Sequence, residues 1–295
     1  MTRINFTGSV LIAFCAAWIT ALSFTPSNAL AREIDPYFKP LVPKLVEAKL
    51  DKAFVESVFQ SPCATFYPRV LVIRLSIRES KINYDQFLSA ESVKRCKEFM
   101  KKNKKTLEQV EKDYKVPGEV LTAILLLETD LGNHTGSFPT LKTLATHAVA
   151  HTKEAADEAY KQLPDKEKKR WTKQAAAERL GNRAAWSFGE LKAFLQHLEK
   201  TKSDPCQYNG SYTGAIGLCQ FQPSNISAYG RDGNKDGTVN LFHVEDALSS
   251  AAEYLKSHGW RPDISYAAKI RVVKTYNQST PYAQTIVKLA SLLRP

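Results

Sequence analysis

Apolar residues recur at spacings of three and four along most of this chain, which is the pattern of amphipathic helices. The clearest example lies between Pro117, which suits the first turn of a helix, and Gly132, which suits its C-terminal stop. The apolar residues that recur there are Val120, Ile124, Leu127 and Leu131. We therefore predict a helix over this stretch, with an apolar side buried in the core.

The same spacing predicts helices in residues 36–60, 92–114, 141–147, 184–200, 244–258 and 281–293. Residues 151–182 read as a helical hairpin that breaks at Leu163-Pro164-Asp165 and is closed by Gly181. Residues 69–77 alternate less regularly and predict a strand or an extended arm, and residues 204–223 are rich in turn formers. Because no series of alternating strands and no internal repeat is evident, the predicted fold class is mainly α.

The N-terminus has the pattern of a secretory signal peptide. Arg3 provides the positive charge, residues 10–22 are apolar, and Ala29-Leu30-Ala31 fits a cleavage site. The apolar segment is short for a membrane-spanning helix and is soon followed by Pro26. We predict that residues 1–31 are removed, that the mature chain has no membrane anchor, and that it lies in the periplasm.

The excess of basic residues favours an anionic binding partner but does not identify it. The chain has 41 Lys and Arg against 30 Asp and Glu, a formal net charge of +11. A basic protein can bind nucleic acid, but a secreted one more often meets an anionic cell-wall polymer or a membrane surface.

Four cysteines follow the signal segment: Cys63, Cys96, Cys206 and Cys219. An even number in an oxidising compartment predicts two disulfides, for which three pairings exist. We favour Cys63–Cys96 and Cys206–Cys219, because each pair lies within one region of the sequence. No cysteine or histidine group has the spacing of a zinc site.

Glu128 is the first candidate for chemistry. It falls in the last turn of the predicted 117–132 helix, where its helical neighbours are Ile124, Leu125, Leu131 and Gly132. Apolar neighbours and the negative end of the helix dipole both raise a carboxyl pKa, and a carboxyl that is partly protonated near neutral pH can act as a general acid. The alternative is a rim residue that pairs with a distant Arg or Lys.

Residues 210–224 form the second candidate. Glycines 210, 214 and 217 allow close approach of the backbone to a ligand, Ser211 and Gln220 offer neutral hydrogen-bonding groups, and Tyr212 and Phe221 offer flat apolar faces. This mixture suits sugars, although a loop with ordinary turn glycines is the alternative.

Together these segments resemble the lytic murein transglycosylases of the membrane-bound lytic transglycosylase B type. The resemblance extends from about residue 84 to residue 292. The matching residues are Leu126-Leu127-Glu128-Thr129, Gly132, Gly136, Leu144-Ala145-Thr146, Phe188-Gly189-Glu190-Leu191, Gly210-Ser211-Tyr212, Gly214-Ala215, Gly217, Gln220-Phe221, Pro223-Ser224, Asp236-Gly237, Asn240-Leu241, Asp246-Ala247, Tyr254, His258-Gly259-Trp260, Tyr276-Asn277, Ser279 and Tyr282-Ala283.

The resemblance implies a lysozyme-like helical core with a glycan groove, in which Glu128 is the single catalytic acid/base. It also implies residues that contact sugar or orient the acid, which are Ser211, Gln220, Phe221, Tyr254, Tyr276, Asn277 and Tyr282. Arg183 matches the second of two adjacent arginines in the family, whereas Asn182 occupies the place of the first.

A single carboxylate is consistent with this chemistry. Ordinary glycosidases use two carboxylates, but Asp130 would point to another face of the helix from Glu128. The resemblance implies that the 6-hydroxyl of the substrate is the nucleophile, so that a 1,6-anhydromuramoyl end forms and no water is consumed.

Two features depart from the family pattern. Residues 151–182 are longer than the pattern requires, so the helical hairpin is an insertion near the groove. Only 15 residues separate Trp260 from Tyr276, where a family member carries a long, partly β segment.

Residues 232–240 contain oxygen-bearing side chains at alternate positions, Asp232, Asn234 and Asp236, followed by Gly237. This is the first half of an EF-hand loop. His243 replaces the closing glutamate, and the resemblance gives that role to Asp246. We predict a structural calcium held also by the Thr238 carbonyl, against the alternative of a turn without metal.

The sequence therefore predicts a lysozyme-like helical core in residues 116–295, with the helical insertion 151–182, and a mostly helical N-terminal region in residues 32–115 that packs on it. We predict a lytic transglycosylase that cleaves the β-1,4 bond between N-acetylmuramic acid and N-acetylglucosamine. It would need no cofactor for catalysis, bind peptidoglycan strands and no nucleic acid, and be a monomer. The alternatives are a non-catalytic peptidoglycan-binding protein and a lysozyme-type hydrolase.

Overall fold

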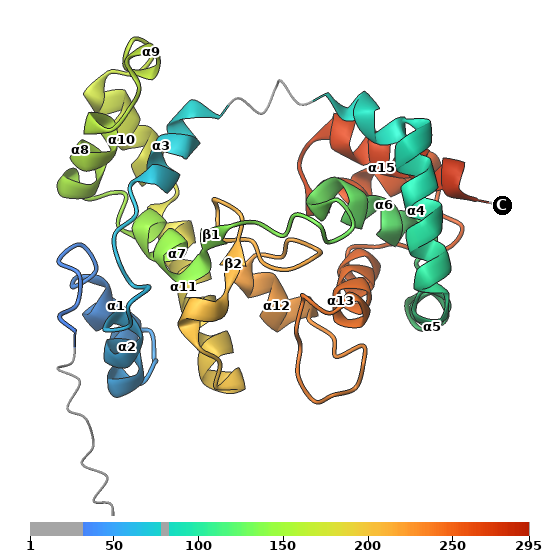
Figure 1. Ribbon diagram of the computed structural model, residues 1–295, viewed down its shortest axis with the longest axis horizontal. Helices are drawn as coiled ribbons and strands as arrows, with labels where there is room; N and C mark the ends of the chain where they lie inside the picture. Colours follow the sequence, from blue (N-terminus) through green and yellow to red (C-terminus); the bar gives the residue numbers. More distant parts are fainter. Residues whose placement is uncertain (1–31, 78–82, 295) are drawn as a thin grey trace, which may run out of the picture. The chain divides into compact units, whose positions relative to one another are not determined.

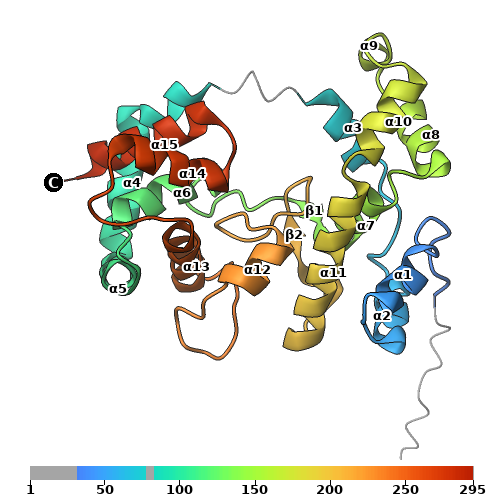
Figure 2. The same cartoon turned by 180° about the vertical axis from the view of Figure 1, so that it is seen from behind.

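The computed structural model describes residues 32–77 and 83–294, drawn from two sides in Figures 1 and 2. The predicted signal peptide, residues 1–31, lies outside the described residues. No helix among the described residues is long and apolar enough to cross a membrane.

The described residues are mainly helical, as predicted. The helices are α1 (Leu41–Glu47), α2 (Lys52–Phe59), α3 (Arg69–Ser76), η2 (Tyr84–Leu88), α4 (Ala90–Lys102), α5 (Lys104–Tyr114), α6 (Gly118–Thr129), α7 (Thr140–Ala148), α8 (Lys153–Lys161), α9 (Asp165–Lys168), α10 (Lys173–Gly181), α11 (Ala184–Thr201), η3 (Pro205–Gln207), α12 (Pro223–Tyr229), α13 (Val244–Ser257), α14 (Tyr266–Tyr276) and α15 (Thr280–Leu293). The strands are β1 (Phe138–Pro139) and β2 (Asn209–Gly210).

Helix α6 lies at the centre of the larger hydrophobic core. It packs against α4, α5, α13 and α15, and nine of its twelve residues are buried. A helix buried on nearly every side has little face on which a charged side chain can reach bulk water. Its two carboxylates, Glu119 in the first turn and Glu128 in the last, are only partly exposed.

A second, smaller core lies between α3, α8 and α10. Figures 1 and 2 show these helices beside one another, and Leu71, Leu75, Leu163 and Leu180 are among the residues buried there. The helical hairpin predicted for residues 151–182 is confirmed, with the short α9 at its tip.

The strand or extended arm predicted for residues 69–77 is wrong, because this segment is α3. Pro68 precedes its first turn, and Val70, Leu71 and Leu75 are buried on one side. Packing against α7, α8 and α10 outweighs the weak helical preference of its β-branched residues.

Two long predicted helices are each divided by one residue. The helix predicted for 92–114 breaks at Asn103, whose side chain donates to the carbonyl of Phe99 at 2.9 Å. The segment 36–60 breaks near Lys49, which has a φ of +73°, and Asp51 then caps α2. Asn and Asp compete with helix continuation in this way because their side chains bond to nearby backbone groups.

A two-stranded antiparallel sheet joins β1 to β2 and leads into the 210–224 loop. A Cβ placed on Gly210 would lie 2.0 Å from the carbonyl oxygen of Ala215, so only glycine fits there. Single bridges connect Ile216 to Gly210 and to Phe221, and they fold the loop back on itself.

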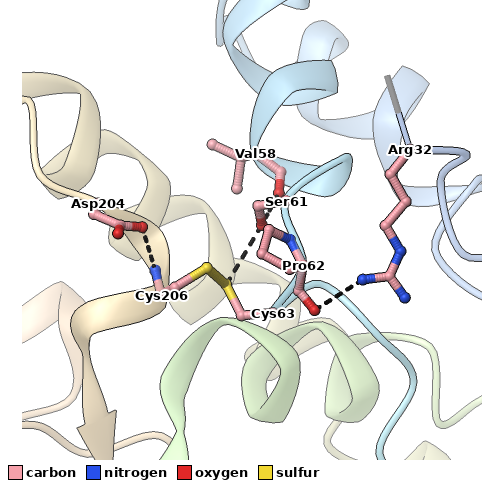
Figure 3. Close-up of a disulfide and its surroundings, with 7 residues drawn as sticks. All are labelled: Arg32, Val58, Ser61, Pro62, Cys63, Asp204 and Cys206. Atoms are coloured by element: carbon pink, nitrogen blue, oxygen red, sulfur yellow. Dashed lines mark hydrogen bonds between the residues drawn. A yellow bond between two sulfur atoms is a disulfide. The ribbon is translucent and has the colours of Figure 1, made fainter. Parts of the chain in front are cut away.

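The predicted disulfide pairing is wrong. The structure joins Cys63, after α2, to Cys206 in η3, with the two Cα atoms 5.5 Å apart, as Figure 3 shows. Cys96 and Cys219 are free and buried in the core. Nearness in sequence misled the prediction, since the fold brings together residues that are 143 positions apart. The cross-link ties the N-terminal helices to the segment that leads into the 210–224 loop.

Candidate active site

Glu128 lies in the last turn of α6, where the chain leaves the helix abruptly. Asp130 and Leu131 both adopt positive φ, at +55° and +61°, and the Thr129 hydroxyl donates to the carbonyl of Leu218 at 2.8 Å. That bond ties the end of the helix to the 210–224 loop. The carboxyl group of Glu128 is thereby held against the loop that was predicted to bind sugar.

A cleft of about 350 Å³ opens over Glu128. The residues that line it are Glu128, Ser211, Tyr212, Thr213, Ala215, Gln220, Phe221, Gln222, Asn225, Tyr254, Tyr276 and Asn277. Glu128 is the only carboxylate among these lining residues. The structure thus brings six of the predicted sugar-contacting residues together around the predicted acid, although they come from widely separated parts of the sequence.

Burial raises the pKa of Glu128 to about 7, from an ordinary value of 4.5. The hydroxyl of Tyr282, on α15, donates to Oε1 of Glu128 at 2.7 Å and opposes that rise, because it favours the charged form. Burial and the neighbouring carboxylate raise the pKa of Tyr282 itself well above 10. Tyr282 therefore remains a proton donor that fixes the orientation of a half-protonated acid.

Aromatic side chains pack along one wall of the cleft. The ring of Phe221 lies 5.7 Å from that of Tyr254 and 5.9 Å from that of Tyr276, measured between centroids. The hydroxyl of Tyr276 donates to the carbonyl of Cys219, and that of Tyr254 to the carbonyl of Thr275 at 2.6 Å. Because both hydroxyls are held, the rings present a fixed apolar surface suited to the face of a sugar.

The polar residues of the loop shape the backbone as well as the cleft. Nε2 of Gln220 donates to the carbonyls of Thr135 and Gly217, at 3.0 and 2.9 Å, and Gln220 has a φ of +50°. Oγ of Ser211 accepts from the backbone N–H of Ala215 at 3.0 Å. A non-glycine residue in the left-handed region persists where its surroundings hold it, and such residues gather at functional sites.

Comparison with known proteins gives the family. The model of the transglycosylase SLT domain matches residues 33–272. The chain belongs to the transglycosylase SLT domain family.

Among related proteins, the membrane-bound lytic murein transglycosylase B of Escherichia coli is 29% identical over 175 residues. The match covers 59% of this chain, and the chain spans 40% of the length of that relative.

Solved structures share the lysozyme-like fold of the family. The soluble lytic transglycosylase SltB1 of Pseudomonas aeruginosa superposes with a TM-score of 0.69 at 21% identity, covering 88% of this chain and 98% of that one. The calcium complex of the E. coli lytic transglycosylase SLT35 gives 0.65 at 20% identity, with 88% and 92% covered. SltB3 of P. aeruginosa, in complex with NAG-anhNAM-pentapeptide, gives 0.69 at 18% identity, with 87% and 78% covered.

Two predicted site residues of this SLT domain lie outside the cleft. Tyr282 is buried behind Glu128 and reaches it only through its hydrogen bond. Arg183 lines a neighbouring cavity that shares Tyr212 and Thr213 with the cleft. Tyr282 therefore positions the Glu128 carboxyl group, and Arg183 lies in the adjoining cavity.

Sequence reasoning missed some lining residues. Gln222 and Asn225 line the cleft, and Nε2 of Gln222 donates to the Thr213 hydroxyl at 3.3 Å. Gln222 lies within the predicted sugar-binding segment 210–224 and Asn225 follows it directly, so their position in or next to that segment was the available signal. Glu190 was noted only as part of a motif, but its carboxylate accepts from the Ser224 N–H and hydroxyl, each at 2.9 Å, and so anchors the start of α12.

Asp130 takes no part in the cleft, as predicted. Burial is the largest single influence on the pKa of Asp130 and raises it, but the ion pair with Arg95 and the other polar neighbours together lower that pKa below its ordinary value. Asn133 also donates to Asp130, at 3.3 Å. The carboxylate of Asp130, close to Glu128 in sequence, is therefore bound by Arg95 and Asn133 outside the cleft.

The predicted calcium loop is folded by its own carboxylates. Asp232 accepts from the N–H groups of Asp236 and Gly237, at 3.1 and 2.8 Å, and Gly237 has the positive φ, +92°, that the loop requires. Asp246 is fully buried and accepts from Gly233, Asn234 and Asn240. Asp232, Asn234 and Asp236 thus fit the first half of a calcium loop, whereas Asp246 serves backbone groups.

Among the residues that the structure describes, no three His, Cys, Asp or Glu side chains form a metal-binding group. Calcium at this loop stays a prediction.

Proposed function

We propose that this chain is a periplasmic lytic transglycosylase that cleaves the β-1,4 bond between N-acetylmuramic acid and N-acetylglucosamine of peptidoglycan. The observation that carries the proposal is Glu128, a single carboxyl group with a pKa of about 7 that lines a cleft otherwise made of neutral side chains. Membership of the SLT domain family supports the same class of reaction.

Glu128 would act twice in one turnover. Its protonated form gives a proton to the glycosidic oxygen as the bond to the anomeric carbon breaks. The resulting carboxylate then takes the proton of the muramic acid 6-hydroxyl as that oxygen bonds to the anomeric carbon. The proton is returned to Glu128, the products are a free 4-hydroxyl and a 1,6-anhydro end, and no water is consumed.

The surroundings of Glu128 suit both steps. A pKa near the working pH makes a group effective as an acid and as a base. The Tyr282 hydroxyl, 2.7 Å from Oε1, keeps the carboxyl group aimed at the cleft in both states. Because no second carboxylate lines the cleft within the described residues, neither mechanism of an ordinary glycosidase has its nucleophile or its base there.

The test is mass spectrometry of the soluble products that the purified mature protein releases from cell-wall sacculi. The expected products carry 1,6-anhydromuramoyl ends. Reducing ends would favour a lysozyme-type hydrolase instead, and sacculi that are bound without release would favour a non-catalytic binding protein. Digestion in water enriched in ¹⁸O separates the first two outcomes, since only hydrolysis incorporates solvent oxygen.

The site residues proposed to contact sugar are Ser211, Gln220, Phe221, Tyr254, Tyr276 and Asn277. Phe221, Tyr254 and Tyr276 would offer apolar surface to the sugar rings, and Ser211, Gln220 and Asn277 would offer polar groups to the hydroxyl and acetamido substituents. A structural calcium at Asp232, Asn234 and Asp236 would brace the loop between Phe221 and α13, outside the reaction itself.

A further inference from the structure

A second cavity, of about 670 Å³, adjoins the Glu128 cleft and shares Tyr212 and Thr213 with it. It contains four arginines: Arg74, Arg170, Arg179 and Arg183. We refer to it as the arginine cavity.

The insertion builds much of this cavity. Arg170 and Arg179 come from the inserted segment 151–182, Arg74 comes from α3, on which that segment packs, and Arg183 precedes α11. The segment by which the sequence departs from the family pattern thus contributes two of the four arginines of this cavity.

The positive charge in the cavity is poorly balanced. No carboxylate lines it, and only Arg170 forms an ion pair within the described residues, with Glu167 at 3.5 Å. Burial, with the charges of Arg183 and Arg179, lowers the pKa of Arg74 to about 10. Like charges held together without counterions favour the binding of an anion.

Several of these side chains are already held in place. The guanidinium of Arg183 lies 5.0 Å from the ring centroid of Trp186, and that of Arg170 lies 5.1 Å from that of Trp171. Nη2 of Arg74 lies 3.5 Å from the carbonyl oxygen of Arg179. Stacked, planar guanidinium groups lose less freedom when they take a carboxylate, so the cavity is prepared for that class of ligand.

His147 supplies a second, independent indication of a ligand. It lines the cavity, is only 3% exposed, and its Nε2 lies 2.9 Å from the carbonyl oxygen of Tyr212. Its buried Nδ1 has no hydrogen-bond partner within the described residues. Burial lowers the pKa of His147 to about 4, and with Nε2 as the donor its neutral Nδ1 is an acceptor. A buried acceptor without a partner is costly, so a ligand with an N–H or O–H group would satisfy it.

We propose that the arginine cavity binds the peptide attached to the muramic acid of the substrate, with the arginines receiving its carboxylates and His147 receiving an amide N–H. This inference rests on the proposed function. A peptide offers both chemistries at once, whereas the phosphate groups of an anionic wall polymer offer no N–H. The shared wall of Tyr212 and Thr213 puts the cavity within reach of a group attached to a sugar in the cleft.

The test measures binding without cleavage, in protein that carries Glu128→Gln. The probes are the disaccharide NAG-anhNAM with and without its pentapeptide, together with a polyglycerol phosphate. The variant is Arg170→Gln with Arg179→Gln, because both side chains are exposed; unchanged binding of the bare disaccharide checks that loss of the Arg170–Glu167 pair leaves the fold intact. The matched control is Lys166→Gln with Lys169→Gln, which removes the same charge from the same insertion outside the cavity.

The variant should bind the peptide-bearing disaccharide at least about tenfold more weakly and the bare disaccharide within about twofold of the parent, while the control changes neither. Equal weakening for both disaccharides, or none for either, would overturn the proposal. The proposal would also be overturned if the two substitutions weakened the binding of polyglycerol phosphate but not that of the peptide-bearing disaccharide. The product assay with wild-type protein is separate, so failure of the proposed reaction is recognised independently of this result.

Discussion

The Glu128 cleft and the arginine cavity share Tyr212 and Thr213 but differ in their charge. Among the described residues, the cleft has one carboxyl group among neutral side chains, whereas the cavity has four arginines. The carboxyl group is that of Glu128, which Tyr282 holds, and the hydroxyls of Tyr254 and Tyr276 and the Gln220 amide are bonded within the protein. In the arginine cavity, Arg74, Arg179 and Arg183 form no ion pair within the described residues, and Nδ1 of His147 has no partner. In the part of the chain that the structure describes, the cleft therefore holds no unpaired charge, although Oε1 of Gln222 lacks a partner, whereas the arginine cavity holds several charges that a ligand would balance.

This difference separates the requirements of chemistry from those of recognition. A proton donor near neutral pH needs burial, a fixed partner and no neighbouring charge that would hold it in one state. A site that attracts an anion needs charges that the protein leaves unbalanced, at some cost to its own stability. The first requirement is met on the central core helix α6, and the second is met by arginines from α3, α10 and the residue before α11.

The largest effect is expected from a substitution of Glu128 in the cleft. Glu128→Gln keeps the size of the side chain but removes the titratable proton, so we expect release of soluble products from sacculi to fall by about a hundred- to ten-thousand-fold. Binding to sacculi should be kept. Asp130→Asn is the control, because Asp130 pairs with Arg95 outside the cleft and should retain most of the activity. Near wild-type turnover by the Gln variant would remove Glu128 from the mechanism.

The disulfide affects both cavities, because Cys206 lies shortly before the loop that carries their shared wall. Cys63→Ser with Cys206→Ser should lower the free energy of unfolding by about 2–5 kcal/mol, measured by chemical denaturation. Cys96→Ala is the comparison variant, since it leaves the cross-link intact. Non-reducing peptide mapping should find Cys63 linked to Cys206 and free thiols at Cys96 and Cys219, and a link to Cys96 would contradict the structure.

The pH dependence of kcat/KM tests the raised pKa of Glu128 in the cleft. With a pKa of about 7, Glu128 is protonated below that pH, so kcat/KM should fall as the pH rises through about 7. The Tyr282 hydroxyl favours the charged form, so Tyr282→Phe should raise the pKa and move this falling limb upward by about one pH unit. Tyr254→Phe removes a hydroxyl bonded to Thr275 and should leave the limb in place. A limb that moves downward in Tyr282→Phe would show that the hydrogen bond has the opposite role.

Calcium should give the smallest effect and should leave the difference between the cavities unchanged. Binding with a dissociation constant on the order of 10⁻⁴–10⁻³ M would stabilise the fold by about 1–2 kcal/mol at a few millimolar calcium, seen as a Tm higher by a few degrees. Asp236→Ala should abolish the increase, whereas the exposed Asp263→Asn should not. Identical melting curves in chelator and in calcium would mean that residues 232–240 form only a turn.

Local patterns in the sequence predicted most of the helices and the raised pKa of Glu128. The apolar repeat around Glu128 and the absence of a partner on its own helix were enough to indicate a raised pKa, since both causes act within a few residues. Tyr282 was named from family resemblance alone, because the hydrogen bond joins positions 154 residues apart. No local rule connects such a pair.

The errors in the sequence prediction arose where tertiary contacts dominate. Residues 69–77 became a helix because a buried core covers Val70, Leu71 and Leu75, although their local pattern was poor. The arginine cavity was not predicted, since Arg74 and Arg179 looked like ordinary charges on separate segments. Arg183 was assigned to the glycan groove from the family pattern, while the structure puts it in the adjoining cavity.

The link between Cys63 and Cys206 has a consequence for the order of events during synthesis. A chain that emerges N-terminus first exposes Cys96 long before Cys206, and the shorter loop from Cys63 to Cys96 closes with an entropic advantage of about 1 kcal/mol. Loop closure thus favours the pair Cys63–Cys96 in the unfolded chain, and a chain oxidised at that stage would reach the native pair by thiol exchange. Once α4 packs on α6, burial raises the pKa of Cys96 to about 12 and leaves its thiol unreactive. Packing of the core thus removes the Cys96 thiol from competition with Cys206 for Cys63.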